Sequence, residues 1–158
     1  MSRSRQFDEA IAWLKKVAVD NPAYTVAHAY LARTYRGKHM YPQSMDGWKL
    51  YGQTNGGPHD VEFAAALDEG NKAGGWKEAL KKGIAMRLAQ RKNGDYFSRF
   101  YIAELYADLG DKDQAFYSLD TAYNEHYGLI NLKTDFLLDP IRSDPHLAEL
   151  VKEVGLPR

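Results

Sequence analysis

A period of about 34 residues, a length typical of helical repeats, constrains the fold of this chain more than any other feature. Four segments of the 158-residue sequence align with one another: FDEAIAWLKKV, YPQSMDGWKLY, WKEALKKGIAM and KDQAFYSLDTA, which begin at Phe7, Tyr41, Trp76 and Lys112. Their fourth residues, spaced 34, 35 and 36 positions apart, are Ala10, Ser44, Ala79 and Ala115. Such repetition indicates stacked supersecondary units, because one unit alone cannot bury its apolar face.

Each aligned segment places its apolar residues on one face of a helix. In the first segment Phe7, Ala10 and Leu14 follow the spacing i, i+3, i+7. The small residue in the middle suits a close crossing with another helix. Matching apolar stretches precede two of the segments, at 31–35 and 102–106. We therefore expect each unit to be a helical hairpin.

Turn-forming residues separate the periodic stretches. The breaks are Asn21-Pro22, Asn55-Gly56-Gly57-Pro58, Gly74-Gly75, Asn93-Gly94 and Leu109-Gly110-Asp111. Such residues end helices, and they would interrupt a continuous coiled coil every dozen or so positions. No stretch alternates between apolar and polar residues as a strand does. The predicted fold class is all-α.

These residues resemble the tetratricopeptide repeat, a helix-turn-helix unit of about 34 residues. The resemblance is closest over 101–122, where the expected positions hold Ala103, Tyr106, Gly110, Ala115, Leu119 and Ala122. It implies a right-handed solenoid of hairpins within a single domain, 1–158. The expected parts are a half repeat (5–24), a repeat (25–58), a divergent repeat (59–95), a repeat (96–126) and a capping tail (127–158). In the divergent repeat Gly83 replaces a large residue, and we expect its second helix to continue to Lys92.

The tail is predicted to end in an amphipathic helix. Asp144 is an N-cap residue and Pro145 suits the first helical position. The helix that follows carries one apolar stripe, formed by Leu147, Leu150, Val151 and Val154. This segment is similar to the tails of tetratricopeptide regions in bacterial multidomain signalling proteins, where such regions follow a DNA-binding domain, a kinase or a nucleotide cyclase. That similarity implies a part of a bacterial regulatory protein.

Composition excludes several classes of partner and site. The chain has 21 Lys and Arg against 21 Asp and Glu, so it lacks the positive charge that nucleic acids and anionic membranes attract. It has no cysteine, and therefore no disulfide or thiolate site. Its longest apolar runs are far shorter than the ~20 residues of a membrane span. Without an apolar stretch at the N-terminus, a cytoplasmic location is expected.

From the sequence we predict no catalytic, metal or cofactor site. The histidines are scattered and lack ligand spacing: His28, His39, His59, His126 and His146. The glycine-rich stretch 70–75 lacks the Lys-Ser/Thr ending of a phosphate-binding loop. Ser98 and Ser118 lack the setting of an exposed nucleophile. We expect no enzyme, although residues distant in sequence can still form a catalytic pair in a helical groove.

The resemblance implies a partner-binding stripe on the first helix of each hairpin, at its second, fifth, ninth and twelfth positions. These are Val26, Ala29, Arg33 and Arg36, then Val61, Ala64, Asp68 and Asn71, then Phe97, Phe100, Glu104 and Ala107. Exposed phenylalanines and arginines would suit an acidic or C-terminal peptide. Alternatively, the phenylalanines pack against a neighbouring helix or the tail, and the arginines pair with Asp68 or Glu104.

The resulting functional hypothesis is a non-catalytic module that binds a peptide or a protein partner in the concave groove, which the first helices of the hairpins are expected to line. The alternatives are a small-ligand or catalytic role in the same groove, and a structural or oligomerising spacer. The half repeat at the N-terminus lacks its first helix. Phe7, Ile11 and Leu14 therefore lack the partner helix that later units provide, and Trp13 extends the same apolar stripe. We expect either that the missing helix lies upstream in a longer protein or that two chains meet there as a homodimer. Alternatively, the next hairpin, which begins near Thr25, covers part of this face and leaves a frayed monomeric end.

Overall fold

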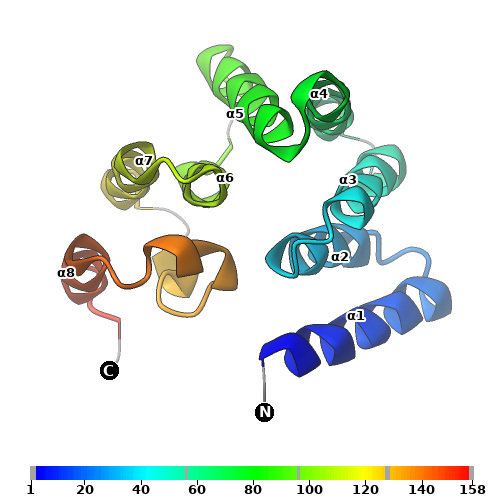
Figure 1. The fold of residues 1–158 in the computed structure, drawn as a ribbon, viewed down its shortest axis with the longest axis horizontal. Helices are drawn as coiled ribbons and strands as arrows, with labels where there is room; N and C mark the ends of the chain where they lie inside the picture. The colour runs from blue at the N-terminus through cyan, green and yellow to red at the C-terminus, as the bar shows by residue number, and fades with distance from the viewer. Residues whose placement is uncertain (1–2, 56, 96, 127–128, 157–158) are drawn as a thin grey trace. The chain divides into compact units, whose positions relative to one another are not determined.

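The described residues form helices and no strands. The computed structural model of the chain describes residues 3–55, 57–95, 97–126 and 129–156. In chain order, the elements of this part are α1 (Arg3–Asp20), α2 (Val26–Gly37), α3 (Tyr41–Asn55), α4 (Pro58–Gly74), α5 (Trp76–Lys92), α6 (Arg99–Leu109), α7 (Lys112–Asn124), the 3-10 helices η1 (Leu129–Asn131) and η2 (Phe136–Ile141), and α8 (Pro145–Glu153) (Figure 1). The prediction of an all-α fold is confirmed, as is the extension of α5 to Lys92. Gly56 and Tyr96, which the sequence placed in a break and at the start of a repeat, lie outside the described residues.

The chain divides into two compact units, an N-terminal unit (1–79) and a C-terminal unit (80–158). Within the N-terminal unit, helices that follow one another in sequence pack against one another: α1 on α2, α2 on α3 and α3 on α4 (Figure 1). The first turn of α5 closes against the end of α4, where Gly70 faces Ala79. The prediction of sequentially packed hairpins is therefore confirmed in this unit.

Small residues allow the close helix crossings of the N-terminal unit. A Cβ atom added to Gly47 of α3 would lie 2.9 Å from the Cβ atom of Ala32 on α2. Beside it the buried Ser44 hydroxyl donates a hydrogen bond of 2.8 Å to the Ala32 carbonyl oxygen. Ala79 is likewise fully buried. The expectation that the fourth position of the repeat serves a close crossing is confirmed at Ser44 and Ala79.

The N-terminal helix is better covered than the sequence suggested. Ile11 and Leu14 are buried in one cluster with Leu31 and Tyr35 of α2. The alternative that the next hairpin covers part of this face is therefore confirmed for Ile11 and Leu14, because α2 supplies the apolar surface against which they pack. Trp13 lies outside that contact and remains 63% exposed.

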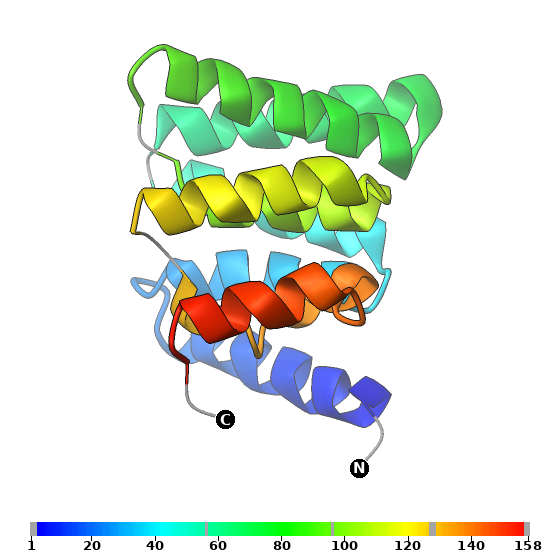
Figure 2. The same ribbon diagram turned by 90° about the vertical axis from the view of Figure 1, so that its left-hand side faces the viewer.

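The C-terminal unit is built around the pair α6 and α7. The 3-10 helix η2 packs on α6, and α8 lies alongside α7 (Figure 2). Their shared core contains Phe100, Ala103, Ala107, Ala115, Phe116, Leu119, Ala122, Leu129, Leu132, Leu138, Ile141, Leu147 and Leu150. The amphipathic tail helix is confirmed, and the two 3-10 helices before it were not anticipated.

Capping groups fix the helix ends of this unit. Gly110 follows α6 in the left-handed conformation, with a φ of 87°. The next residue, Asp111, caps α7 by accepting a hydrogen bond of 3.1 Å from the backbone N–H of Gln114. Asp144 caps α8 in the same way through the N–H of His146, also at 3.1 Å. These turns and caps lie where the sequence predicted helix boundaries.

Candidate functional site

The predicted stripe on α2 is partly buried. Val26 is 37% exposed, whereas Ala29 and Arg33 are half-buried. Arg36 is only 4% exposed, so the expectation that it lies on an open face is wrong. Because α2 packs against α1 on one side and against α3 on another, little of its surface remains open. Arg36 lies one turn after Ala32, the residue that meets α3.

The predicted stripe on α6 is mostly core. Phe100 is 2% exposed and belongs to the shared core of the C-terminal unit, and Glu104 is 1% exposed. Ala107 is also buried in that core. The expectation of an exposed Phe100 is therefore wrong. The alternative that this phenylalanine packs against neighbouring helices is confirmed.

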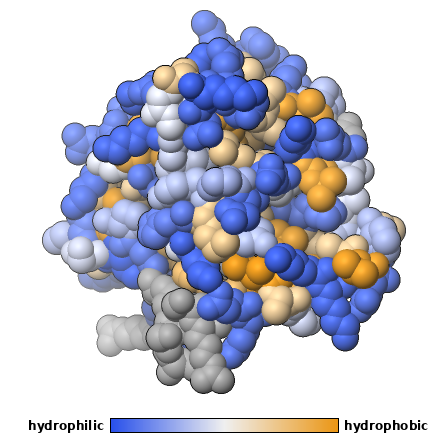
Figure 3. Space-filling model, turned by 45° about the vertical axis from the view of Figure 1, so that its right-hand side comes forward, coloured by the Kyte–Doolittle hydropathy of each residue, from blue (hydrophilic) through white to orange (hydrophobic). Residues whose placement is uncertain are grey.

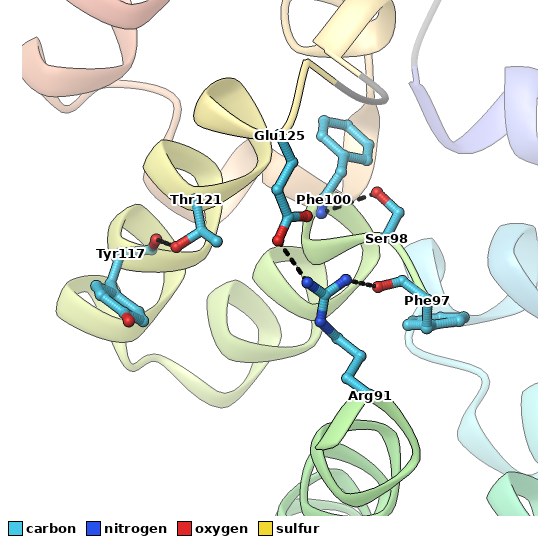
Figure 4. A network of polar contacts seen from close by, with 7 residues as sticks. All are labelled: Arg91, Phe97, Ser98, Phe100, Tyr117, Thr121 and Glu125. Carbon is cyan, nitrogen blue, oxygen red and sulfur yellow. Dashed lines mark hydrogen bonds and ion pairs between the residues drawn. The ribbon is translucent and has the colours of Figure 1, made fainter. Parts of the chain in front are cut away.

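Phe97 is half-buried beneath polar side chains of α5. The Arg87 guanidinium lies 4.1 Å from the centre of the Phe97 ring and donates a hydrogen bond of 3.1 Å to the Gln90 side-chain oxygen. Arg91 donates to the Phe97 backbone carbonyl and pairs at 2.5 Å with the carboxylate of Glu125, the residue that follows α7 (Figure 4). These contacts hold the segment before α6 in place.

The sequence did not predict that two polar residues of α5 are buried. Arg87 is 2% exposed and Gln90 is 4% exposed. Helix α5 carries six Lys and Arg residues, so no charge pattern separated the buried Arg87 from its exposed neighbours. Together with Phe97 and Arg91, these residues form a local network of contacts between α5 and the residue Phe97.

The predicted stripe on α4 lines a groove. Three of its four positions, Val61, Ala64 and Asp68, border a groove of about 260 Å³ between α3 and α4. The fourth, Asn71, is half-buried and does not line it. The complete lining is Met45, Asp46, Lys49, Gln53, Val61, Ala64, Ala65 and Asp68. We call this feature the α3–α4 groove.

The groove exists because large side chains fill one side of the interface between α3 and α4, whereas small side chains line the other. On one side Trp48 of α3 packs edge-on against Phe63 of α4, with ring centres 5.6 Å apart. On the groove side α4 presents the small side chains of Ala64 and Ala65. Gly52 brings the helices together at one end, since an added Cβ would lie 3.0 Å from the Asp60 backbone.

The rim of the groove is charged. Asp68 pairs with Lys72 at 2.5 Å, and both side chains are more than half exposed. Asp46 and Lys49 make no hydrogen bond or ion pair with any other residue that the structure describes. The α3–α4 groove therefore combines an apolar floor with charged groups that are available for an incoming ligand.

A second hollow, of about 530 Å³, lies near the end of the C-terminal unit. It is lined by Tyr123, His126, Leu129, Ile130, Glu153, Val154 and Leu156. None of the residues predicted to bind a partner borders it.

Three further observations concern metal ligands, membrane spans and surface hydropathy. Within the described ranges, no group of three or more His, Asp and Glu residues could hold a metal ion. No described helix is long and apolar enough to cross a membrane. Figure 3 shows one face of the molecule, on which hydrophilic side chains predominate and apolar ones form separate spots. A site on that face would depend on shape and charge more than on a broad apolar surface.

Comparisons with known proteins found no relative of this chain. No family model matches this chain. Comparisons with curated proteins and with solved structures found no match either. The functional argument therefore depends on the geometry and charge of the α3–α4 groove.

Proposed function

We propose that this chain is a non-catalytic binding module that holds a peptide segment of a partner protein in the α3–α4 groove. The observation that carries the proposal is the position of Val61, Ala64 and Asp68. The tetratricopeptide resemblance assigns these three residues to the partner-facing stripe, and they line an open groove in the N-terminal unit. Grooves between helices are a recurring mode of peptide recognition.

The finer proposal for the fold is that the hairpins are divergent tetratricopeptide repeats in a right-handed superhelix. The sequential packing of α1 to α4 and the small residues at their crossings support it.

The dimensions of the groove favour a peptide side chain over a whole small molecule. Pockets that enclose drug-sized ligands have volumes of roughly 300–1,000 Å³. The α3–α4 groove, at about 260 Å³, is smaller, and four of its lining residues have exposed polar or charged side chains: Asp46, Lys49, Gln53 and Asp68. It has room for one or two side chains of a segment whose backbone remains outside.

A groove-filling variant tests the proposal. Ala65 is exposed on α4, so Ala65→Trp fills the groove without changing the helix core. Short peptides selected from a random display library on the wild-type chain should lose most of their affinity for this variant. Ala148→Trp, at an exposed position of α8, is the matched control and should retain binding.

Circular dichroism should show equal helix content in all three proteins. Selected peptides that bind Ala65→Trp as tightly as wild type would place the binding site elsewhere. A library that yields no peptide with measurable affinity would contradict the binding function itself.

A further inference from the structure

The hairpin of α3 and α4 is acidic within a chain of zero net charge. Residues 41–74 contain five carboxylates and two lysines, which gives a net charge of −3 at pH 7 with histidine neutral. The carboxylates are Asp46, Asp60, Glu62, Asp68 and Glu69. A local excess of negative charge attracts cationic segments and raises their association rate.

Two of these carboxylates stand on opposite walls of the groove. Asp46 comes from α3 and makes no polar contact with the rest of the described chain. Asp68 comes from α4, and its pair with Lys72 involves side chains that are 56% and 72% exposed. Such exposed pairs contribute little to stability, so a cationic ligand can compete for Asp68.

The floor between the two carboxylates is apolar. Ala64 and Ala65 leave space there, while Met45 and Val61 provide larger apolar surfaces. A ligand that matches both features needs an apolar side chain for the floor and a neighbouring cation for the walls. The aliphatic stem of Lys or Arg also packs well along apolar surface while its charged end remains in water.

We propose that the α3–α4 groove selects a partner segment in which Lys or Arg lies within two positions of a large apolar residue. This inference rests on the proposed peptide-binding function and names the class of partner. The apolar side chain occupies the space above Ala64 and Ala65. The cationic group lies between the carboxylates of Asp46 and Asp68.

The charge of Lys49 allows an experiment to distinguish a basic ligand from an acidic one. Lys49 lies on the α3 wall one turn from Asp46 and has no ion pair with any described residue. For a basic ligand its charge is repulsive, and removing that charge strengthens binding. For an acidic ligand the same charge is attractive, and removing it weakens binding.

The test uses short peptides selected from a random display library on the wild-type chain. The selected sequences should be enriched in Lys or Arg close to Leu, Ile, Phe or Met. The tightest peptide is then fluorescently labelled and titrated against single variants at low salt. Asp46→Asn should weaken binding about two- to fivefold, and Lys49→Gln should tighten it by a similar factor.

Glu149→Gln, an exposed position on α8 with the same change of charge as Asp46→Asn, is the control and should leave the affinity unchanged. Both expected effects should shrink as salt is raised. In a peptide from the same selection, replacing its Lys or Arg by Gln should weaken binding to wild type and abolish the effect of Asp46→Asn.

The outcomes separate this inference from the function on which it rests. Acidic selected peptides, or weaker binding to Lys49→Gln, would overturn the basic partner and leave peptide binding in the groove intact. Peptides that ignore both Asp46→Asn and Ala65→Trp would overturn the site. The absence of any binding peptide would overturn the proposed function and this inference together.

Discussion

Gly70 on α4 is the residue that brings α4 closest to the start of α5. An added Cβ atom would collide with the Glu78 carbonyl oxygen and lie 2.6 Å from the Ala79 Cα atom. Both obstacles are backbone and cannot rotate away. Gly70→Ala is therefore expected to lower the free energy of unfolding by about 1–3 kcal/mol, measured by denaturant titration.

Gly74→Ala is the matched control on the same helix. Its added Cβ would lie 2.6 Å from the Glu78 Cγ atom, which belongs to a flexible side chain. Because alanine also favours the helix, the free energy of unfolding should remain within about 0.5 kcal/mol of wild type or rise by up to about 1 kcal/mol. Equal effects of the two substitutions would contradict the close approach at Gly70.

His126 is a non-glycine residue in the left-handed conformation. Its φ is 55°, and it follows the last turn of α7 with its N–H bonded to the Tyr123 carbonyl oxygen at 3.0 Å. Glycine adopts this conformation without steric cost. His126→Gly should raise the free energy of unfolding by about 0.5–1 kcal/mol, measured by denaturant titration, whereas His126→Ala should bring no such gain. A stability gain for alanine as large as that for glycine would refute the conformational explanation.

At the scale of elements, α6 supplies a pH-dependent contribution to stability. Burial raises the pKa of Tyr106 above its usual value of 10.0, the Asp111 carboxylate raises it further, and Arg99 partly opposes them. The neutral phenol is thus favoured in the folded chain. Its stabilising effect is complete below about pH 10, the pKa of an unfolded tyrosine, and is lost as pH rises through the raised pKa of the folded state.

Tyr106→Phe should therefore reduce the fall in unfolding free energy as the pH rises above about 10. Tyr117→Phe, at a 59% exposed position on α7, is the control and should keep the wild-type decline. Denaturant titrations at several pH values measure both. An identical decline in wild type and Tyr106→Phe would show that burial of this phenol does not control alkaline stability.

The individual helices differ in how far the sequence could predict their open faces. Helix α4 has distinct apolar and polar sides, and three of its predicted stripe residues line the groove. Helix α6 is buried at 100, 102–105 and 107, so a stripe on it cannot be assigned by periodicity. Arg36 shows the same difficulty on α2, because a long side chain can be buried where the pattern predicts a charged open face.

On the scale of the whole chain, helix boundaries were largely predictable because they depend on local chemistry. Gly75, Gly94 and Gly110 have positive φ values beside helix ends, where the sequence placed breaks. The 3-10 helix η2 packs against α6 and is followed by Arg142, which donates a hydrogen bond of 2.7 Å to Asp139, and no local sequence pattern predicted it. The sequence predicted a concave groove lined by the first helices, whereas half of the lining of the α3–α4 groove comes from α3, a second helix. Its place could not be predicted, because it depends on which side of the α3–α4 interface the aromatic pair fills.

Self-association remains a prediction for the whole chain. Trp13 is 63% exposed on α1, and Val19 on the same helix is 77% exposed. Burying one such side chain at an interface contributes about 1.5–3 kcal/mol. We expect the average mass by light scattering to rise with concentration across a hundredfold dilution series. Trp13→Lys should reduce that rise without lowering stability, and a constant monomeric mass for wild type would exclude the dimer.

The position of the tryptophans gives the chain a built-in spectroscopic asymmetry. All three, Trp13, Trp48 and Trp76, belong to the N-terminal unit, and residues 80–158 contain none. Trp48 packs on Phe63 and Trp76 stacks on Tyr41 with ring centres 4.4 Å apart, whereas Trp13 faces solvent. Emission excited selectively from tryptophan therefore follows the melting of one unit, while far-ultraviolet ellipticity follows both. Any gap between the two curves reports directly whether the halves of this chain lose their structure together.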